Sequence, residues 1–333
     1  MGSLVRILYC CSSARLRGGL RHRAGSAPHA AARSALAALC ALLLATLLAI
    51  PPVHAGEPDG AAAMRARQAE LADAMARSPF RMPLVLQSSE TDRNATGEIY
   101  ALVEHPYLRL ANGLTNPANW CELLILHINI KYCTIDKGRS PPEIDVWIGR
   151  KTWQEVSSAS RVDFRFQLVA LTPDYMQIDL ISPEGPMGTS NYRIRFEAIP
   201  AGGSANTSRS FVRMRYSYEF GTMARLAMQA YLATLGRGKV GFTPIGEQGA
   251  EKGGEKGAEP QYVGGMRGVV ERNAMRYYLA IDAWMSAPAS DPETRLVRWF
   301  DATERYSQQL AEMDKYTYLD MKRREIRRQR ELP

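Results

Sequence analysis

The sequence predicts an α+β fold in which an antiparallel sheet is combined with helices. The first observation is the stretch Arg161–Phe220, where apolar and charged residues alternate through four consecutive segments. A period of two with one apolar and one charged face is typical of a sheet that is wet on one side and covered on the other. The second observation is a set of helical patterns after residue 220, in which apolar residues recur every three or four positions.

Two strands and two short helices are expected ahead of this sheet core. Leu84–Glu90 reads as a strand, Thr91–Asn94 as a turn and Gly97–Val103 as a returning strand, which predicts a hairpin. A helix is expected to start at Pro106, and a second one at Asn116-Pro117, where the asparagine would cap and the proline would occupy the first turn. Two further strands are predicted at Ile125–Ile135 and Glu143–Ile148.

The chain after the sheet core divides into helices and one low-complexity segment. A helix is predicted from Thr222 to Gly236, and a second one over Gly265–Ala287. Between them, residues 243–264 are dominated by Gly, Glu, Lys and Ala, which predicts a flexible insert with nothing to bury. Residues 265–333 are expected to form helices that pack on the domain and end in a basic tail.

The first 55 residues read as a targeting segment. They contain six arginines, no acidic residue, the apolar run Ala35–Ile50 and a small-x-small site that ends at Ala55. This layout predicts a secretory signal peptide, with an uncleaved anchor as the alternative. The expected location is therefore periplasmic or secreted after cleavage, or anchored in the inner membrane and facing the periplasm. Residues 56–80 would then be an exposed helical lead-in, and residues 84–235 the main domain.

The charge of the chain gives no support for nucleic-acid binding. Six of the 42 basic residues lie in the leader, so the remainder of the chain contains 36 basic and 34 acidic residues. These nearly equal numbers give no excess of positive charge of the kind that nucleic-acid-binding proteins carry. Only His105 and His127 lie outside the leader, and the sequence has no nucleophile elbow, phosphate loop or dinucleotide fingerprint. No metal and no cofactor is predicted, and a binding protein is preferred to an enzyme.

Two cysteines remain after the leader, Cys121 and Cys133. Export favours a disulfide between them. One straight strand from Leu124 to Ile135 would carry Cys133 beyond the ~7 Å that a disulfide spans between Cα atoms, whereas a bend near His127 would bring the two together. Both possibilities stay open at this point.

The order of the predicted elements resembles the START-like helix-grip fold of the SRPBCC superfamily. The local likeness lies in Gly97–Pro106, where a strand leads into a proline-started helix, and in Leu114–Trp120, which is similar to an "L-x-D/N-P-x-x-W" segment. The resemblance covers roughly Leu84–Leu235. It implies a curved sheet of six to eight strands that grips a long helix, and either Thr222–Leu235 or Gly265–Ala287 could be that helix.

The resemblance also implies a cavity for an apolar molecule between the sheet and the helix. Small-molecule pockets are mostly apolar with few polar groups, and aromatic residues of the predicted strands would project to one side. The alternative is that the same aromatics form a solid core. The candidate cavity-lining residues are Phe164, Phe166, Tyr192, Phe196, Tyr216, Tyr218, Trp120, His127 and Asn129.

His127, Asn129 and Lys131 would share one face of the predicted strand. They could orient a ligand head group or supply a base. The preferred interpretation is that they belong to the wet face of an edge strand.

The expected function is that of a periplasmic binder or carrier of a lipid-like small molecule. A cyclase- or hydrolase-type enzyme of the same fold and an envelope protein that binds a partner through its C-terminal helices are the alternatives. The basic run Lys322–Arg330 could contact an anionic membrane, or it could be a solvated helix end.

Overall fold

The computed structural model describes residues 60–136, 138–202, 208–234, 238–245 and 261–332. The predicted signal peptide and most of the predicted flexible insert lie outside these residues. None of the helices in the described ranges is both long enough and apolar enough to cross a membrane.

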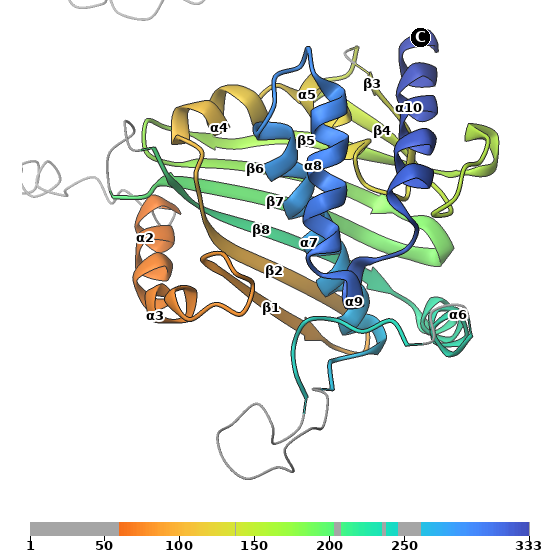
Figure 1. Ribbon diagram of the computed structural model, residues 1–333, viewed down its shortest axis with the longest axis horizontal. Helices are drawn as coiled ribbons and strands as arrows, with labels where there is room; N and C mark the ends of the chain where they lie inside the picture. Colours follow the sequence, from red (N-terminus) through yellow and green to blue (C-terminus); the bar gives the residue numbers. More distant parts are fainter. Residues whose placement is uncertain (1–59, 137, 203–207, 235–237, 246–260, 333) are drawn as a thin grey trace, which may run out of the picture. The chain divides into compact units, whose positions relative to one another are not determined.

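Eight antiparallel strands form one curved sheet, in the order β1-β2-β8-β7-β6-β5-β4-β3 (Figure 1). The four strands predicted within Arg161–Phe220 are present as neighbours, and the predicted fold class is confirmed. The strands are β1 Leu84–Glu90, β2 Asn94–Val103, β3 Ile130–Asp136, β4 Glu143–Ile148, β5 Ser160–Leu171, β6 Met176–Glu184, β7 Thr189–Pro200 and β8 Ser210–Phe220.

Helices cover both faces of this sheet. The cap expected at Asn116 is in place, since its side chain accepts a hydrogen bond from the Ala118 backbone amide, and Asp291 caps α8 in the same way by accepting one from the Thr294 backbone amide. The helices are α2 Gly60–Glu70, α3 Ala72–Ala76, α4 Tyr107–Leu114, α5 Pro117–Leu124, α6 Thr222–Ala233, α7 Gly265–Met285, α8 Pro292–Glu304, α9 Ser307–Leu310 and α10 Lys315–Glu331, with the 3-10 turns Val156–Ser158 and Pro186–Gly188.

The long helix gripped by the sheet is α7, the second of the two candidates. It packs on β1, β2 and β8, and α8 covers its other side (Figure 1). Gly97 on β2 permits the close approach, since a β-carbon there would lie 2.8 Å from the carbonyl oxygen of Val270. By contrast α6 lies near one end of the sheet, and its Met223 and Leu226 side chains are exposed.

The segment expected to be an exposed lead-in instead packs on the outer face of the sheet, which is the face opposite α7. Ala61 and Met64 of α2 are buried, and so are Leu71 and Met75 around α3. They contact a second, smaller apolar cluster of the sheet: Tyr100, Tyr175, Ile199 and Phe211. The few apolar residues of this short segment give too weak a periodic pattern to predict this burial from the sequence.

Ile125–Asn129 is a bend rather than the start of a strand, and β3 begins only at Ile130. Ile125, Leu126 and Ile128 are all buried. In the sequence such a run of apolar residues resembles a buried strand, which is why a strand was expected here. The bend returns the chain toward α5, so the Cα atoms of Cys121 and Cys133 lie 5.3 Å apart and the two residues form a disulfide. Of the two possibilities left open by the sequence, the bent one is correct.

Candidate ligand site between the sheet and α7

The predicted aromatic side chains all lie on the inner face of the sheet. They are buried and belong to one hydrophobic cluster that also contains much of α7. Trp120 reaches this layer from α5, where its indole nitrogen donates to the Leu114 carbonyl oxygen and its ring meets Phe166 at 6.4 Å. The residues in this layer are Phe164, Phe166, Tyr192, Phe196, Tyr216, Tyr218 and Trp120. Their contact with a ligand stays a prediction.

Four tyrosines form the part of the layer that carries polar atoms. Tyr192, Tyr216 and Tyr218 come from β7 and β8, and Tyr277 from α7. Their rings follow one another with centroids 5.1 Å apart for Tyr192–Tyr218, 5.8 Å for Tyr216–Tyr218 and 5.4 Å for Tyr216–Tyr277. Burial raises the pKa of each of these phenols, so all four stay protonated at neutral pH.

Two of the buried polar atoms in this region have no hydrogen-bond partner within the described part of the chain. One is the Tyr218 hydroxyl and the other is Nε2 of His127. By contrast the Tyr192 hydroxyl accepts a hydrogen bond from Thr189 Oγ1 at 2.9 Å. A buried polar atom that stays unpaired costs about 1–3 kcal/mol, so each one requires an explanation.

His127 extends the row of aromatic rings beyond Tyr277. It lies in the bend before β3, and its ring stacks on Tyr277 with centroids 4.7 Å apart. Burial lowers the pKa of His127 well below its usual value, and the positive charge of Arg276 acts in the same direction. Nδ1 of the neutral ring accepts a hydrogen bond from the backbone N–H of Asn129, 3.2 Å away. The ring proton therefore lies on Nε2.

Asn129 points elsewhere. Its side-chain amide donates to the Gly149 carbonyl oxygen at 2.7 Å and is half-buried, so it ties the end of β4 to the bend. The loop that follows, with Lys151, is thereby held near His127. The structure thus brings His127 to the aromatic layer, while the Asn129 side chain fixes the backbone beside it.

A group of cations shares one carboxylate next to this end of the layer. Glu312, just after α9, lies 2.7 Å from Lys151 Nζ, 2.7 Å from Arg276 Nη2 and 3.3 Å from Lys239 Nζ. Burial alone would raise the pKa of Glu312, but the three cations hold it below its usual value. The side chains of Glu312 and Arg276 are about one-twentieth exposed, whereas those of Lys151 and Lys239 are more than a quarter exposed.

The expectation that His127 and Lys131 belong to a wet edge strand is wrong, because α10 covers that edge. Lys131, Lys322 and Glu325 are fully buried, with Glu325 3.0 Å from Lys131 Nζ and 2.8 Å from Lys322 Nζ. Lys322 also donates to the carbonyl oxygens of His127 and Ile130, both at 2.8 Å. The solvated tail expected at Lys322–Arg330 is therefore a docked helix, and membrane contact through its exposed arginines stays a prediction.

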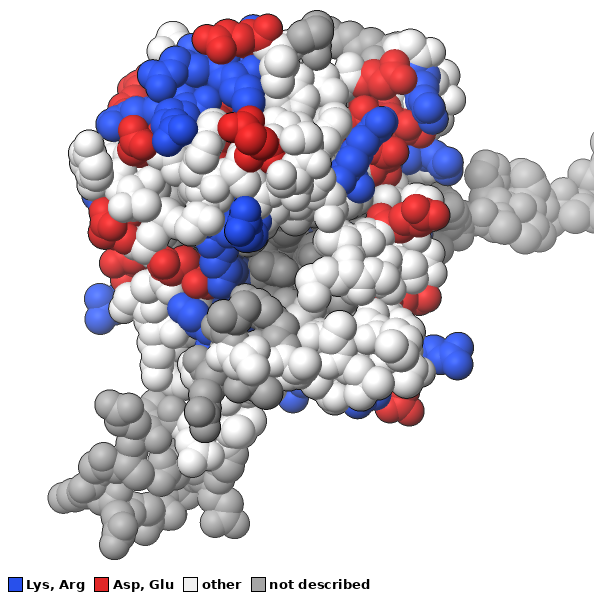
Figure 2. Space-filling model, turned by 90° about the vertical axis from the view of Figure 1, so that its right-hand side faces the viewer, with Lys and Arg blue, Asp and Glu red and all other residues white. Residues whose placement is uncertain are grey.

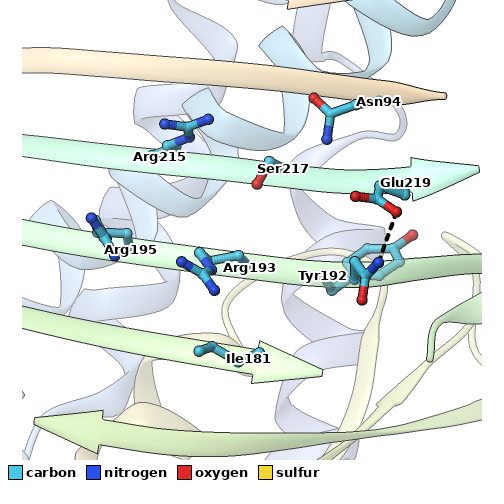
Figure 3. A pocket seen from close by; sticks show the side chains of 9 residues that line it. Asn94, Ile181, Tyr192, Arg193, Arg195, Arg215, Ser217 and Glu219 are labelled. Carbon is cyan, nitrogen blue, oxygen red and sulfur yellow. Dashed lines mark hydrogen bonds between the residues drawn. The ribbon is translucent and has the colours of Figure 1, made fainter. Parts of the chain in front are cut away.

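The outer face of the sheet carries a different polar surface. A shallow pocket of about 340 Å³ lies over β7 and β8, and Arg193, Arg195 and Arg215 line it (Figure 3). Each of these guanidinium groups has an acidic neighbour: Arg195 binds Asp179 through two 2.8 Å hydrogen bonds, Arg193 lies 3.8 Å from the same carboxylate, and Arg215 lies 3.4 Å from Glu98. This network accounts for the alternating charges without a ligand.

Sequence reasoning missed Tyr277 and the cations around Glu312. Arg276 and Tyr277 are neighbours in a helix whose apolar stripe was read only for packing, and Arg276 pairs with Glu312 in the short segment between α9 and α10. No spacing rule links Lys151, Lys239 and Glu312. Metal-binding geometry is absent as well from the ranges that the structure describes, where no three His, Cys, Asp or Glu side chains are placed to hold an ion.

Comparison with known proteins finds similarity only among solved structures. No protein-family model matches the chain, and no curated protein matches it. Norcoclaurine synthase from Thalictrum flavum, in complex with dopamine and hydroxybenzaldehyde, is 11% identical with a TM-score of 0.31, covering 46% of this chain and 89% of the synthase. Human StAR-related lipid transfer protein 5 is 9% identical with a TM-score of 0.28, covering 52% and 89%. A protein from Arthrobacter aurescens is 14% identical with a TM-score of 0.28, covering 58% and 87%. Likenesses this distant show nothing about the function of this chain.

Proposed function

We propose that the protein binds and carries an apolar, lipid-like small molecule between the sheet and α7. The observation that carries the proposal is the pair of unpartnered polar atoms, Tyr218 hydroxyl and His127 Nε2, at the buried aromatic layer. A ligand with a polar group would give such atoms the partner that the protein leaves out. An apolar surface with a few convergent polar groups is the usual character of small-molecule sites.

Access to this layer is best supported at the His127 end. Lys151 and Lys239 are partly exposed there, while Arg276 and Glu312, which they contact, are buried. Figure 2 shows a hollow near the centre of one face of the molecule, with Lys and Arg side chains beside it. We expect a molecule to enter beside Lys151 and Lys239, because they are the partly exposed members of the cluster that contains Arg276, the neighbour of Tyr277 in α7.

We place this activity outside the cytoplasm. The support is the leader-like composition of residues 1–55, with its arginines and apolar run, and the Cys121–Cys133 disulfide, because disulfides persist mainly in oxidising compartments. Fractionation of cells that express the full chain, with the mass of the exported product, tests the location. Recovery of the uncleaved protein in the cytoplasm would refute it.

Catalysis by His127 is the second candidate function, favoured by its buried and neutral ring. The protonation pattern weighs against a base, since Nδ1 is occupied by the Asn129 amide and Nε2 carries the proton. In this state Nε2 can donate a hydrogen bond but cannot accept a proton. We therefore assign His127 to ligand binding.

Native mass spectrometry of protein purified after export, followed by solvent extraction, tests for a bound molecule. Titration with the neutral apolar probe N-phenyl-1-naphthylamine tests the site when none is retained. Tyr218→Phe removes only the unpartnered hydroxyl, so it should keep or raise the unfolding free energy while weakening retention of the natural ligand. Tyr100→Phe is the matched control, because its hydroxyl bonds Glu98 on the outer face.

Failure of the protein both to retain a molecule and to bind the probe would overturn the proposal. If the wild-type protein and Tyr218→Phe retain the natural ligand equally, the Tyr218 hydroxyl does not contribute to binding. Loss of retention in the Tyr100→Phe control would point to an outer-face site instead.

A further inference from the structure

The end of the aromatic layer at His127 is surrounded by more positive than negative charge. In the described ranges, two clusters flank this histidine. In one cluster Glu312 is shared by Lys151, Lys239 and Arg276, and in the other Glu325 is shared by Lys131 and Lys322. Five cations therefore face two carboxylates. Most of these groups are buried, where uncompensated charge is costly.

The two clusters differ in how far the protein compensates them. Around Glu325 backbone carbonyl groups complete the environment: Lys131 Nζ donates to Ile128 oxygen at 3.0 Å, and Lys322 donates to two further carbonyls. Around Glu312, Lys239 also donates to the Ala311 carbonyl oxygen at 2.7 Å. Lys151 has only Glu312 as an ion partner among the described residues, so its ammonium group keeps donor capacity for a further partner.

A chain of contacts joins Lys151 to His127. The imidazole stacks on Tyr277, the neighbouring residue Arg276 binds Glu312, and Glu312 binds Lys151. From the other side, the Asn129 side chain holds Gly149, two residues before Lys151. The unpartnered Nε2–H and the partly exposed ammonium group therefore belong to the same end of the site.

His127 Nε2–H and Lys151 Nζ are both donors, and the carboxylate of Glu312 already contacts three cations. An alcohol would bring no charge, and its O–H group would add a third donor beside these two. A carboxylate brings acceptors only and one negative charge, so it matches both the hydrogen bonding and the charge.

We infer that the bound molecule is an apolar acid whose carboxylate is received by His127 Nε2 and Lys151 Nζ, with its apolar part against the rings of Tyr277 and Tyr216. The inference rests on the proposed function and adds the chemical class of the ligand. A phosphate ester is the less favoured anion, because a second negative charge increases the cost of removing the group from water.

The test compares three probes of equal chain length: hexadecanoic acid, hexadecan-1-ol and hexadecyl phosphate. Their affinities are measured at pH 8 by displacement of N-phenyl-1-naphthylamine from the delipidated full protein, with each probe kept below its micellar concentration. The acid should bind about tenfold or more tightly than the alcohol, as expected when a charged hydrogen bond replaces a neutral one.

Two variants locate the carboxylate. Lys151→Met keeps the length of the side chain and removes the charge, and His127→Phe keeps a ring against Tyr277 and removes Nε2–H. In both variants the affinity for the acid should fall close to the affinity for the alcohol, and the affinity for the alcohol should stay unchanged. Lys315→Met is the matched control, because this surface lysine pairs with Asp301 and should leave the preference unchanged. If His127→Phe does not fold, Lys151→Met decides the question alone.

The outcomes separate the two proposals. Equal affinity for the acid and the alcohol overturns the inference and leaves the carrier function standing. Displacement by none of the three probes counts against the carrier function. Tighter binding of hexadecyl phosphate than of the acid overturns the carboxylate assignment, and an acid preference that survives Lys151→Met overturns the role of Lys151.

Discussion

Replacement of Glu325 by glutamine should be among the most damaging single changes in the chain. Its carboxylate lies 3.0 Å from Lys131 Nζ and 2.8 Å from Lys322 Nζ, and all three side chains are fully buried. Glutamine keeps nearly the same shape but leaves both ammonium groups without a counter-charge and turns an amide donor toward one of them.

The expected loss is about 3–5 kcal/mol of unfolding free energy, the range found when one partner of a buried ion pair is removed. This would be a large part of the roughly 5–15 kcal/mol that stabilises a typical domain. Burial lowers the pKa of Lys322 to about 8 even with Glu325 present. Without the carboxylate that pKa falls further, so the variant should regain stability as pH rises toward 10 and both lysines lose their protons.

Urea unfolding followed by circular dichroism, at pH 7 and at pH 9.5, measures both effects. Glu293→Gln is the matched control, since Glu293 pairs with Arg323 of α10 at the surface, and its loss should leave stability nearly unchanged. A Glu325→Gln deficit below about 1 kcal/mol at pH 7, or a deficit that grows with pH, would refute the electrostatic account of how α10 is held.

Three further outcomes are expected. Replacing Cys121 and Cys133 by alanine should cost about 3 kcal/mol in urea unfolding, because the disulfide closes a short loop of 12 residues' separation; a change under 1 kcal/mol would contradict this. Gly97→Ala should cost about 1–3 kcal/mol through overpacking against α7, whereas Gly221→Ala, with nothing near its β-carbon position, should be nearly neutral. The unfolding free energy of the wild-type protein should rise between pH 8 and 10, because the depressed pKa of Lys322 makes the unfolded state bind more protons than the folded state. Above pH 10 it should fall, because tyrosines ionise in the unfolded state while the buried ones stay protonated. An unfolding free energy that falls steadily from pH 8 would contradict the expected rise.

The sheet was predictable because each strand of its centre is apolar on one face and charged on the other. That alternation is a local property, visible in β5 to β8 without knowledge of any contact. The choice of the gripped helix was not predictable in the same way. Helix α7 is buried on nearly all sides yet carries Glu271, Arg272 and Arg276, whose partners lie elsewhere in the chain. The partners that permit the burial of these charges are not visible in the sequence, so both candidate helices stayed open.

The aromatic members of the candidate site could be listed from the sequence, but its polar end could not. Strand periodicity correctly placed Tyr192, Tyr216 and Tyr218 on one face. It misjudged Lys131, because the partner that permits its burial, Glu325, lies 194 residues further along the chain. Long-range ion pairs of this kind follow no spacing rule, so only the folded structure shows that the edge of the sheet is covered.

The two faces of the sheet differ in how their polar groups are satisfied. On the outer face the like-charged Arg195 and Arg215 lie directly opposite each other on β7 and β8, an unfavourable arrangement by itself. Acidic residues on the next strands out, Asp179 on β6 and Glu98 on β2, neutralise them in the same row. On the inner side, five cations near His127 share two carboxylates, and the Nε2–H group of His127 has no acceptor among the described residues. A fold that balances its exposed charges strand by strand, and leaves a donor unpaired in its interior, has the property expected of a site completed by an acceptor from outside the chain.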